Sequence, residues 1–349
     1  MIRAEPNLLA DPTADPDASA PARPPRGARA KKNPSNPLLQ REFPSAPVPA
    51  WARACGRAGQ GGPLFFAGAS LALLDAFLRR DPPAAGALRQ RLALSSGAAS
   101  AKILRVNGDE GALRDLRFAV GEELGPAAKL LRLWRDLAAR PPSLDPSRLA
   151  AAAARLDLAL PDPNRLASSL KACAGEGDPV SAAAKAAAFA FSTFPDAPAA
   201  EAEILAHWVF DLAFAVRLGW PRPLPLIATR ILDPGLGSDG GGRRARPNEA
   251  AWARTAAAAI ALGAATTLDL AADLARRADT LTAAAPKLRA KPAAKVVDLL
   301  LTEDCVSPAE AARQAPMTDR AARRLFDRLV ALGAARELTG RLTFRLYGL

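Results

Sequence analysis

The sequence predicts an all-α helical domain followed by a C-terminal winged helix-turn-helix with a small β-hairpin wing. Apolar residues recur at helical period from about residue 63 to 286, with Pro, Gly and Asp between the periodic runs. The last part of the chain instead contains three short capped helices and then an alternating apolar–basic pattern typical of strands. The expected organisation is a disordered Pro/Ala/Arg-rich tail (1–49), an α-helical domain (50–286) and a winged helix-turn-helix domain (287–349).

Composition favours a polyanionic partner. The 349 residues carry a formal net charge of +12, and the sequence pI is about 10.4. Cys55, Cys173 and Cys305 lie far apart without metal-binding spacing, which is typical of a reducing cytoplasm. The chain starts without an apolar signal segment. The longest apolar runs, near residues 63–74 and 256–268, are too short to cross a bilayer, so we expect a cytoplasmic protein without membrane contact.

The central segment is predicted to be helical almost throughout. Trp208, Trp220 and Trp252 are expected to anchor its core. Glycines between residues 234 and 247 indicate a mobile loop, because no Gly-Lys-Ser/Thr phosphate-binding motif follows them. The expected helices cover residues 64–80, 84–106, 127–140, 146–156, 163–174, 179–194, 199–218, 224–232 and 248–285.

Start and stop signals divide the last segment into elements. A short helix is expected over residues 293–301, and Ser307 with Glu310 matches the capping box of a second helix over residues 308–315. Thr318 is expected to cap a third helix, which runs to residue 332 before Gly333 ends it in the left-handed conformation.

The third helix is amphipathic. Arg320, Arg323, Arg324 and Arg328 share one side with Asp319 and Asp327, which leaves this face net basic. A face of this kind is either simply solvated or used to grip DNA. The opposite side carries the apolar residues Ala322, Leu325, Phe326, Leu329, Val330 and Leu332.

A hairpin is expected after the third helix. Residues 336–338 and 341–347 form its strands and Thr339-Gly340 its turn, with Gly340 free to adopt positive φ. Arg341 would lie at the tip of this wing, where it could touch a DNA backbone or minor groove. The predicted DNA-binding residues are Arg320, Arg323, Arg324, Arg328, Arg341 and Arg345.

Few residues point to catalysis. The only histidine, His207, lies between Glu203 and Asp211 at four-residue spacing, so the three side chains share one helix face. Such a face can hold a metal or orient a general base, but no second histidine completes a site, and a structural cluster is the expected role. Asp109 is expected to cap a helix in which Glu110 and Arg114 pair. We therefore expect no enzyme activity, no metal and no cofactor.

Several segments carry a resemblance to a known family. Residues 89–94, 217–226, 285–291, 321–329 and 336–349 resemble an uncharacterised bacterial family catalogued as domain of unknown function 1403. The resemblance covers about residues 50–349, and it implies no activity.

The segment 337–341 is also similar to the C-terminal winged helix of some Fic-type adenylyltransferases. Those enzymes need a His-Pro-Phe motif followed by a Gly-Asn-Gly-type phosphate loop. Here Trp208 follows His207 and no such loop follows, so the resemblance implies a winged helix but no adenylyltransferase chemistry.

These observations favour a DNA-binding or regulatory protein that acts through its winged helix. The helical domain would serve self-association or a protein partner. The alternative is a protein-interaction module, as in plasmid maintenance or toxin–antitoxin pairs, whose winged helix contacts protein. A third hypothesis is an enzyme that uses the face of Glu203, His207 and Asp211.

Overall fold

The computed structural model describes residues 48–49, 52–53, 62–119, 125–175, 177–237, 243–288, 292–341 and 343–349. The predicted disordered tail therefore lies outside the described residues, apart from Val48 and Pro49. Pro44–Leu349 forms one compact unit. Val48 and Ala52 are buried in its core.

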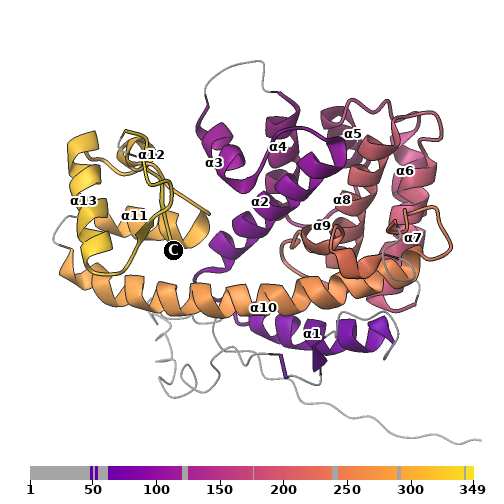
Figure 1. Cartoon of the computed structure of the whole chain (residues 1–349), viewed down its shortest axis with the longest axis horizontal. Coiled ribbons are helices and arrows are strands. Elements are labelled where there is room, and N and C mark those ends of the chain that lie inside the picture. The colour runs from indigo at the N-terminus through magenta and orange to yellow at the C-terminus, as the bar shows by residue number, and fades with distance from the viewer. Residues whose placement is uncertain are drawn as a thin grey trace, which may run out of the picture. The chain divides into compact units, whose positions relative to one another are not determined.

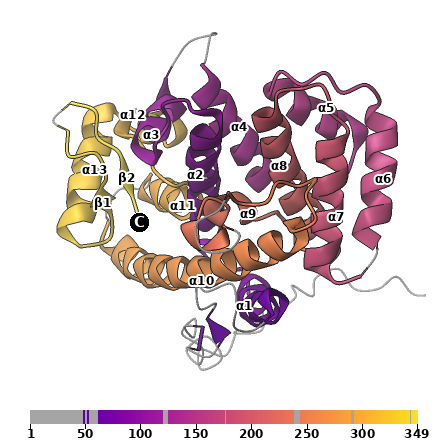
Figure 2. The same cartoon turned by 45° about the vertical axis from the view of Figure 1, so that its right-hand side comes forward.

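The described chain is mostly helical, as the sequence predicts (Figures 1 and 2). Strands are confined to two short segments within it, β1 (Arg336–Glu337) and β2 (Tyr347–Gly348). The helices are α1 (Pro63–Leu78), α2 (Ala85–Leu104), α3 (Glu110–Phe118), α4 (Pro126–Ala139), α5 (Pro146–Arg155), α6 (Pro163–Gly175), α7 (Pro179–Ser192), α8 (Ala199–Leu218), α9 (Ile227–Arg230), η2 (Pro234–Leu236), α10 (Trp252–Ala284), η4 (Ala285–Lys287), α11 (Ala293–Thr302), α12 (Pro308–Gln314) and α13 (Asp319–Ala331).

Local signals explain where the helices begin. The Asp178 carboxylate accepts hydrogen bonds from the backbone N–H groups of Val180 and Ser181 at the start of α7. Asp109 caps α3 in the predicted way, and Arg114 lies 3.5 Å from Glu110 within that helix. These contacts satisfy donors that the first turn of a helix would otherwise leave free.

Helix α10 organises the packing. It is 33 residues long, and both views place it between α1 on one side and α2 and α9 on the other. Helix α8 packs against α7 and is buried around most of its surface. Trp208, Trp220 and Trp252 are buried in the core, as predicted. Burial of these large rings contributes to the hydrophobic stabilisation of the helices.

One helix of the described chain is longer and more apolar than the sequence analysis allowed for. Trp252–Lys287 is long and apolar enough to cross a membrane, which corrects the expectation that every apolar run is too short. However, 67 % of its most apolar window is buried inside the protein. A central core helix meets the same criteria, so the feature is weak evidence for a membrane span.

Residues 292–349, called the C-terminal module below, contain α11, α12 and α13 and both strands. Ser307, Thr318 and Gly333 behave as predicted: the first two cap α12 and α13, and Gly333 has φ 67°. The capping box is only half formed, because Glu310 turns to an arginine of α3 instead of to the Ser307 backbone.

The predicted hairpin differs from the observed one. Each strand is two residues long, and Glu337 pairs with Tyr347. Residues 338–346 form a longer loop between them, with residue 342 outside the description. The Glu337 carboxylate accepts hydrogen bonds from the backbone N–H groups of Thr339 and Gly340, 2.8 and 2.7 Å long. These bonds turn the chain just after Leu338, whose N–H still donates to the Leu346 carbonyl at 2.8 Å.

The glycine-rich connection contains one element that the sequence analysis did not predict. Pro234–Leu236 is a short 3₁₀ helix, capped by the Asp233 side chain. Residues 238–242, on which the mobile-loop prediction mainly rests, lie outside the described residues.

Candidate nucleic-acid interface

Helix α13 is held in place by its apolar face. Ala322, Leu325, Phe326 and Leu329 are buried against the rest of the C-terminal module. The Phe326 ring stacks on Tyr347 of β2, with centroids 4.4 Å apart and planes within 10°. Because this face is fixed, the opposite face of α13 must point outward.

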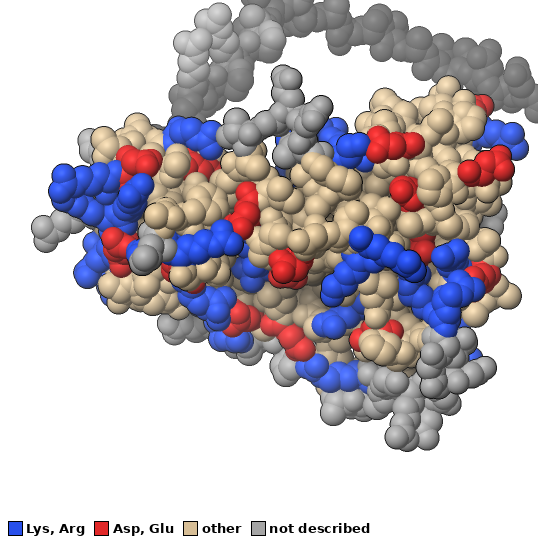
Figure 3. All heavy atoms as spheres, turned by 45° about the horizontal axis from the view of Figure 1, so that its top comes forward, with Lys and Arg blue, Asp and Glu red and all other residues tan. Residues whose placement is uncertain are grey.

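The outward face is basic. Arg320, Arg323, Arg324 and Arg328 are all exposed. Arg323 lies 3.6 Å from Asp319 one turn earlier, a weak exposed pair. The other three arginines form no ion pair with any described residue. Figure 3 shows basic side chains gathered at its left edge, the side on which α13 lies in Figure 1.

The loop between the strands packs against α3, whereas the sequence predicts a wing tip that is free to contact DNA. The Arg341 guanidinium lies 2.8 Å from the Asp115 carboxylate of α3. Phe344 meets Phe118, also of α3, edge to face with centroids 5.9 Å apart. Arg345 is exposed, and its Nε donates to the Arg341 carbonyl. Of the predicted contact residues, Arg341 thus already has a carboxylate partner within the protein.

A buried ion-pair network joins the C-terminal module to the helices before it. Asp304 follows α11, is 3 % exposed, and accepts from Arg91 of α2 and Arg114 of α3, the latter at 2.8 Å. Burial by itself would raise the pKa of Asp304, but the two guanidinium groups lower it further than burial raises it. The carboxylate therefore stays ionised in the interior.

The neighbouring acids extend this network. Arg117 of α3 lies 2.8 Å from Glu310 and 3.2 Å from Glu303, while Arg135 of α4 lies 2.7 Å from Glu303. Burial, reinforced by Asp304, raises the pKa of the Cys305 thiol to about 12, so this cysteine is a packed side chain and not a nucleophile.

A close backbone approach accompanies the network. A Cβ atom at Gly86 of α2 would lie 2.6 Å from the Thr302 Cα at the end of α11. Only glycine fits there, because any side chain would push the two helices apart. The C-terminal module is therefore packed against α2 as well as paired with its arginines.

The three side chains of the predicted cluster on α8 are buried, and each has different neighbours. Glu203 pairs with Arg244 and lies 3.7 Å from Arg246, and Asp211 accepts from the backbone N–H groups of Leu226 and Ile227 at 2.9 and 3.2 Å. Burial raises the pKa of Asp211 well above its usual value, in spite of those two hydrogen bonds.

His207 lies between these acids and is fully buried, with its ring stacked on Trp252 at 5.8 Å. Neither ring nitrogen has a hydrogen-bond partner among the described residues. Burial, and secondarily the charge of Arg244, lowers the His207 pKa to about 3. Within the described ranges, no three His, Cys, Asp or Glu side chains are placed to hold a metal ion.

A family model described as "Protein of unknown function (DUF1403)" matches residues 38–349. The chain belongs to the DUF1403 family. The resemblance expected from the sequence is therefore confirmed, and it extends further toward the start of the chain than expected. No curated protein matches the chain at a significant level.

In this DUF1403 chain, sequence reasoning identified the outward arginines of α13 but not the buried network. The local pattern predicts Glu310 as a capping partner and places Glu303 and Asp304 after the end of the helix over residues 293–301. Glu303, Asp304 and Glu310 lie close together in the sequence around the start of α12. This group of acids was the available signal, because charges that become buried need partners. Their partners, Arg91, Arg114 and Arg117, are about two hundred residues away, and local patterns do not indicate such pairs.

Proposed function

We propose that the C-terminal module is a winged helix-turn-helix that binds DNA and gives the protein a DNA-binding or regulatory role. The order of its elements supports this. Val306, between α11 and α12, pairs with Tyr347, and β1 pairs with β2. The three segments thus form a row with β2 in the middle, a small sheet beside a three-helix unit. The similarity of this ending to Fic-associated winged helices remains a prediction.

The outward arginines of α13 carry the proposal. A guanidinium can donate two parallel hydrogen bonds to a guanine edge or to a phosphate. Arg320 and Arg324 lie one turn apart near the start of α13, the end that a recognition helix inserts into the major groove. Arg323 and Arg328 would then lie nearer the phosphates, and Arg345 would add a contact from the loop.

The wing would contribute only after a rearrangement. Arg341 must leave Asp115 to reach a phosphate or a minor groove. The exchange is inexpensive, because both groups of this pair are partly exposed, and such pairs contribute about 0–1 kcal/mol. Binding through α13 does not require this exchange.

The test is fluorescence anisotropy of the full chain with a labelled mixed-sequence duplex at several salt concentrations. The double variant Arg323→Ala/Arg328→Ala, which removes the two arginines assigned to the phosphates, should bind more weakly, and its salt slope should be flatter by roughly two phosphate contacts. The double variant Arg165→Ala/Lys171→Ala is the matched control, because it removes two exposed positive charges from α6, which lies at the other end of the helical unit from α13. Equal binding by the α13 double variant and the wild type would contradict the proposal.

A second candidate is a protein-interaction module, as in plasmid maintenance or toxin–antitoxin pairs. The observation that favours it is the loop: Arg341 and Phe344 both contact protein, at Asp115 and Phe118 of α3. A winged helix whose wing already rests on protein can use its remaining surface for another protein. This candidate function is favoured if the α13 variants bind DNA as tightly as the wild type does.

Further expectations from the sequence accompany this proposal. A cytoplasmic location and self-association through the helical segment remain proposals. Enzyme activity at Glu203, His207 and Asp211 is the weakest hypothesis, because all three side chains are buried and two of them already serve structural contacts.

A further inference from the structure

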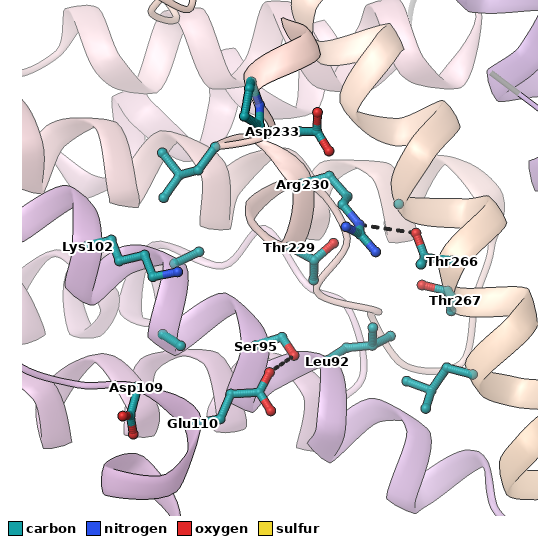
Figure 4. Close-up of a pocket in the computed structure, with 16 residues that line it drawn as sticks. Leu92, Ser95, Lys102, Asp109, Glu110, Thr229, Arg230, Asp233, Thr266 and Thr267 are labelled. Atoms are coloured by element: carbon teal, nitrogen blue, oxygen red, sulfur yellow. Dashed lines mark hydrogen bonds between the residues drawn. The ribbon is translucent and has the colours of Figure 1, made fainter. Parts of the chain in front are cut away.

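A pocket of about 610 Å³ lies away from the proposed DNA-binding face. Helices α2 and α10, the start of α3 and the segment from α9 to η2 line it (Figure 4). A pocket of this volume suits a small organic molecule.

The carboxylates around the pocket are already engaged. Asp109 accepts from the Ala112 backbone N–H at 2.8 Å, and Asp233 accepts from that of Gly235 at 2.9 Å. Glu110 accepts from the Ser95 hydroxyl at 2.6 Å and also lies 3.5 Å from Arg114. The acids on these walls therefore have donors of their own.

The basic residues of the pocket differ from the acids. Lys102 is exposed and extends from α2, while the half-buried Arg230 extends from α9 toward the same space (Figure 4). Arg230 donates from Nε to the Thr266 hydroxyl at 3.1 Å, which orients its guanidinium group. Neither cation forms an ion pair with a carboxylate in the part of the chain that the structure describes.

The remaining lining is largely apolar on one side. Leu92 and Ala98 are buried at the α2 wall, and Leu270 lies on α10. An occupant therefore meets two cations together with a hydrocarbon surface. A purely inorganic anion would leave that surface in water, whereas a neutral hydrophobic molecule would leave the cations without a counter-charge.

We propose that this pocket binds a small amphipathic organic anion. Arg230 holds its carboxylate, phosphate or sulfonate group, Lys102 adds a second positive charge from the α2 wall, and its apolar part packs on Leu92 and Leu270. The Thr266 hydroxyl keeps the guanidinium pointed at the anion, which reduces the entropy lost on binding. The inference does not depend on DNA binding by α13.

Two fluorescent probes with the same aromatic body separate the charge contribution from the apolar one. Anilinonaphthalene sulfonate carries a negatively charged sulfonate group, and phenylnaphthylamine has no charged group. Arg230→Gln and Lys102→Gln should each weaken sulfonate binding about tenfold, in line with the loss of one charge-assisted contact. Both variants should bind the neutral probe as the wild type does. Ala99→Phe, which fills the pocket from α2, should weaken both probes.

Lys171→Gln on α6 is the matched control, because it removes one exposed positive charge far from the pocket lining. It should leave sulfonate binding unchanged. Circular dichroism melts show whether each variant is folded, and Lys102 is exposed enough that its replacement should leave the fold intact. The proposal is overturned if Lys102→Gln binds the sulfonate probe as the wild type does, or if Lys171→Gln weakens it equally.

Discussion

The two faces of the C-terminal module use charge in opposite ways. On the inner face, Asp304 is almost completely buried and meets Arg91 and Arg114. On the outer face, Arg320 and Arg324 are exposed and form no ion pair with a described residue. Buried charges must be paired because water no longer solvates them, whereas exposed cations can remain free for a polyanion. The inner face is therefore structural, and the outer face is the one available for binding.

The largest effect is expected for the removal of Asp304, the buried acid of the inner face. Asp304→Ala should cost about 3–5 kcal/mol of unfolding free energy, because it leaves two guanidinium groups without their carboxylate in a mostly buried place. Asp319→Ala, on the exposed face of α13, should cost less than about 1 kcal/mol. Denaturant unfolding at neutral pH measures both. Similar costs for the two variants would mean that the inner and outer pairs do not differ in energy.

The same pair predicts an acid dependence. The pKa of Asp304 in the folded chain is below the ordinary value of 3.8. Its contribution to stability is therefore complete above pH 3.8 and is lost as the pH falls through the lower folded-state pKa. Asp304→Ala should abolish this part of the acid destabilisation, which a pH series of unfolding curves would reveal.

His207 is also a buried titratable group, but unlike Asp304 it has no hydrogen-bond partner among the described residues to stabilise its charged form. Its folded pKa is about 3 against 6.5 in an unfolded chain, so the unfolded state binds a proton first as the pH falls. Stability is therefore complete above pH 6.5 and decreases as the pH drops from there toward 3. The decrease between pH 6.5 and 5 should be about 2 kcal/mol.

His207→Phe keeps a ring against Trp252 and removes the titration, so its unfolding free energy should lack this slope. The difference between wild type and variant isolates His207 from Glu203, Asp211 and Arg244, which face it in both proteins. Parallel pH profiles for the two proteins would exclude the assigned pKa.

On the outer face, stability and binding should separate. Arg320→Ala and Arg324→Ala should each cost about 1–3 kcal/mol of DNA-binding free energy and relax sequence preference. Their unfolding free energies should change by no more than about 0.5 kcal/mol, because neither side chain forms an ion pair with a described residue. Competition titrations and denaturation on the same preparations test both halves. A large loss of stability would mean that these arginines stabilise the fold, as Arg91 and Arg114 do.

The smallest effect is expected at Asp115 of α3, which pairs with Arg341 of the C-terminal module. Asp115→Asn should change the unfolding free energy by less than about 1 kcal/mol, since its pair with Arg341 is partly exposed. It should also free Arg341 and steepen the salt slope of DNA binding by about one phosphate contact. The double variant Asp115→Asn/Arg341→Ala is the control and should lose that gain. An unchanged slope in the single variant would mean that the wing does not reach DNA.

Much of the architecture could be predicted because its causes are local. Asp109, Ser307 and Thr318 cap the helices that they precede, since each side chain accepts from a backbone N–H three residues ahead. The basic face of α13 and the burial of Phe326 follow from helical period alone, whereas Val330, expected on the apolar side, is 40 % exposed. These features depend on a few neighbouring residues, so the sequence by itself determined them.

Tertiary structure decided what depends on distant partners. The loop between the strands rests on α3 through Arg341 and Phe344, and no local pattern indicates those contacts. The Glu310 carboxylate pairs with Arg117 instead of completing its capping box. Charge pairing and the pocket around Arg230 require helices that are far apart in sequence to come together. Burial of apolar side chains brings these helices together, and no local pattern specifies which of the chain's many arginines then meets which acid.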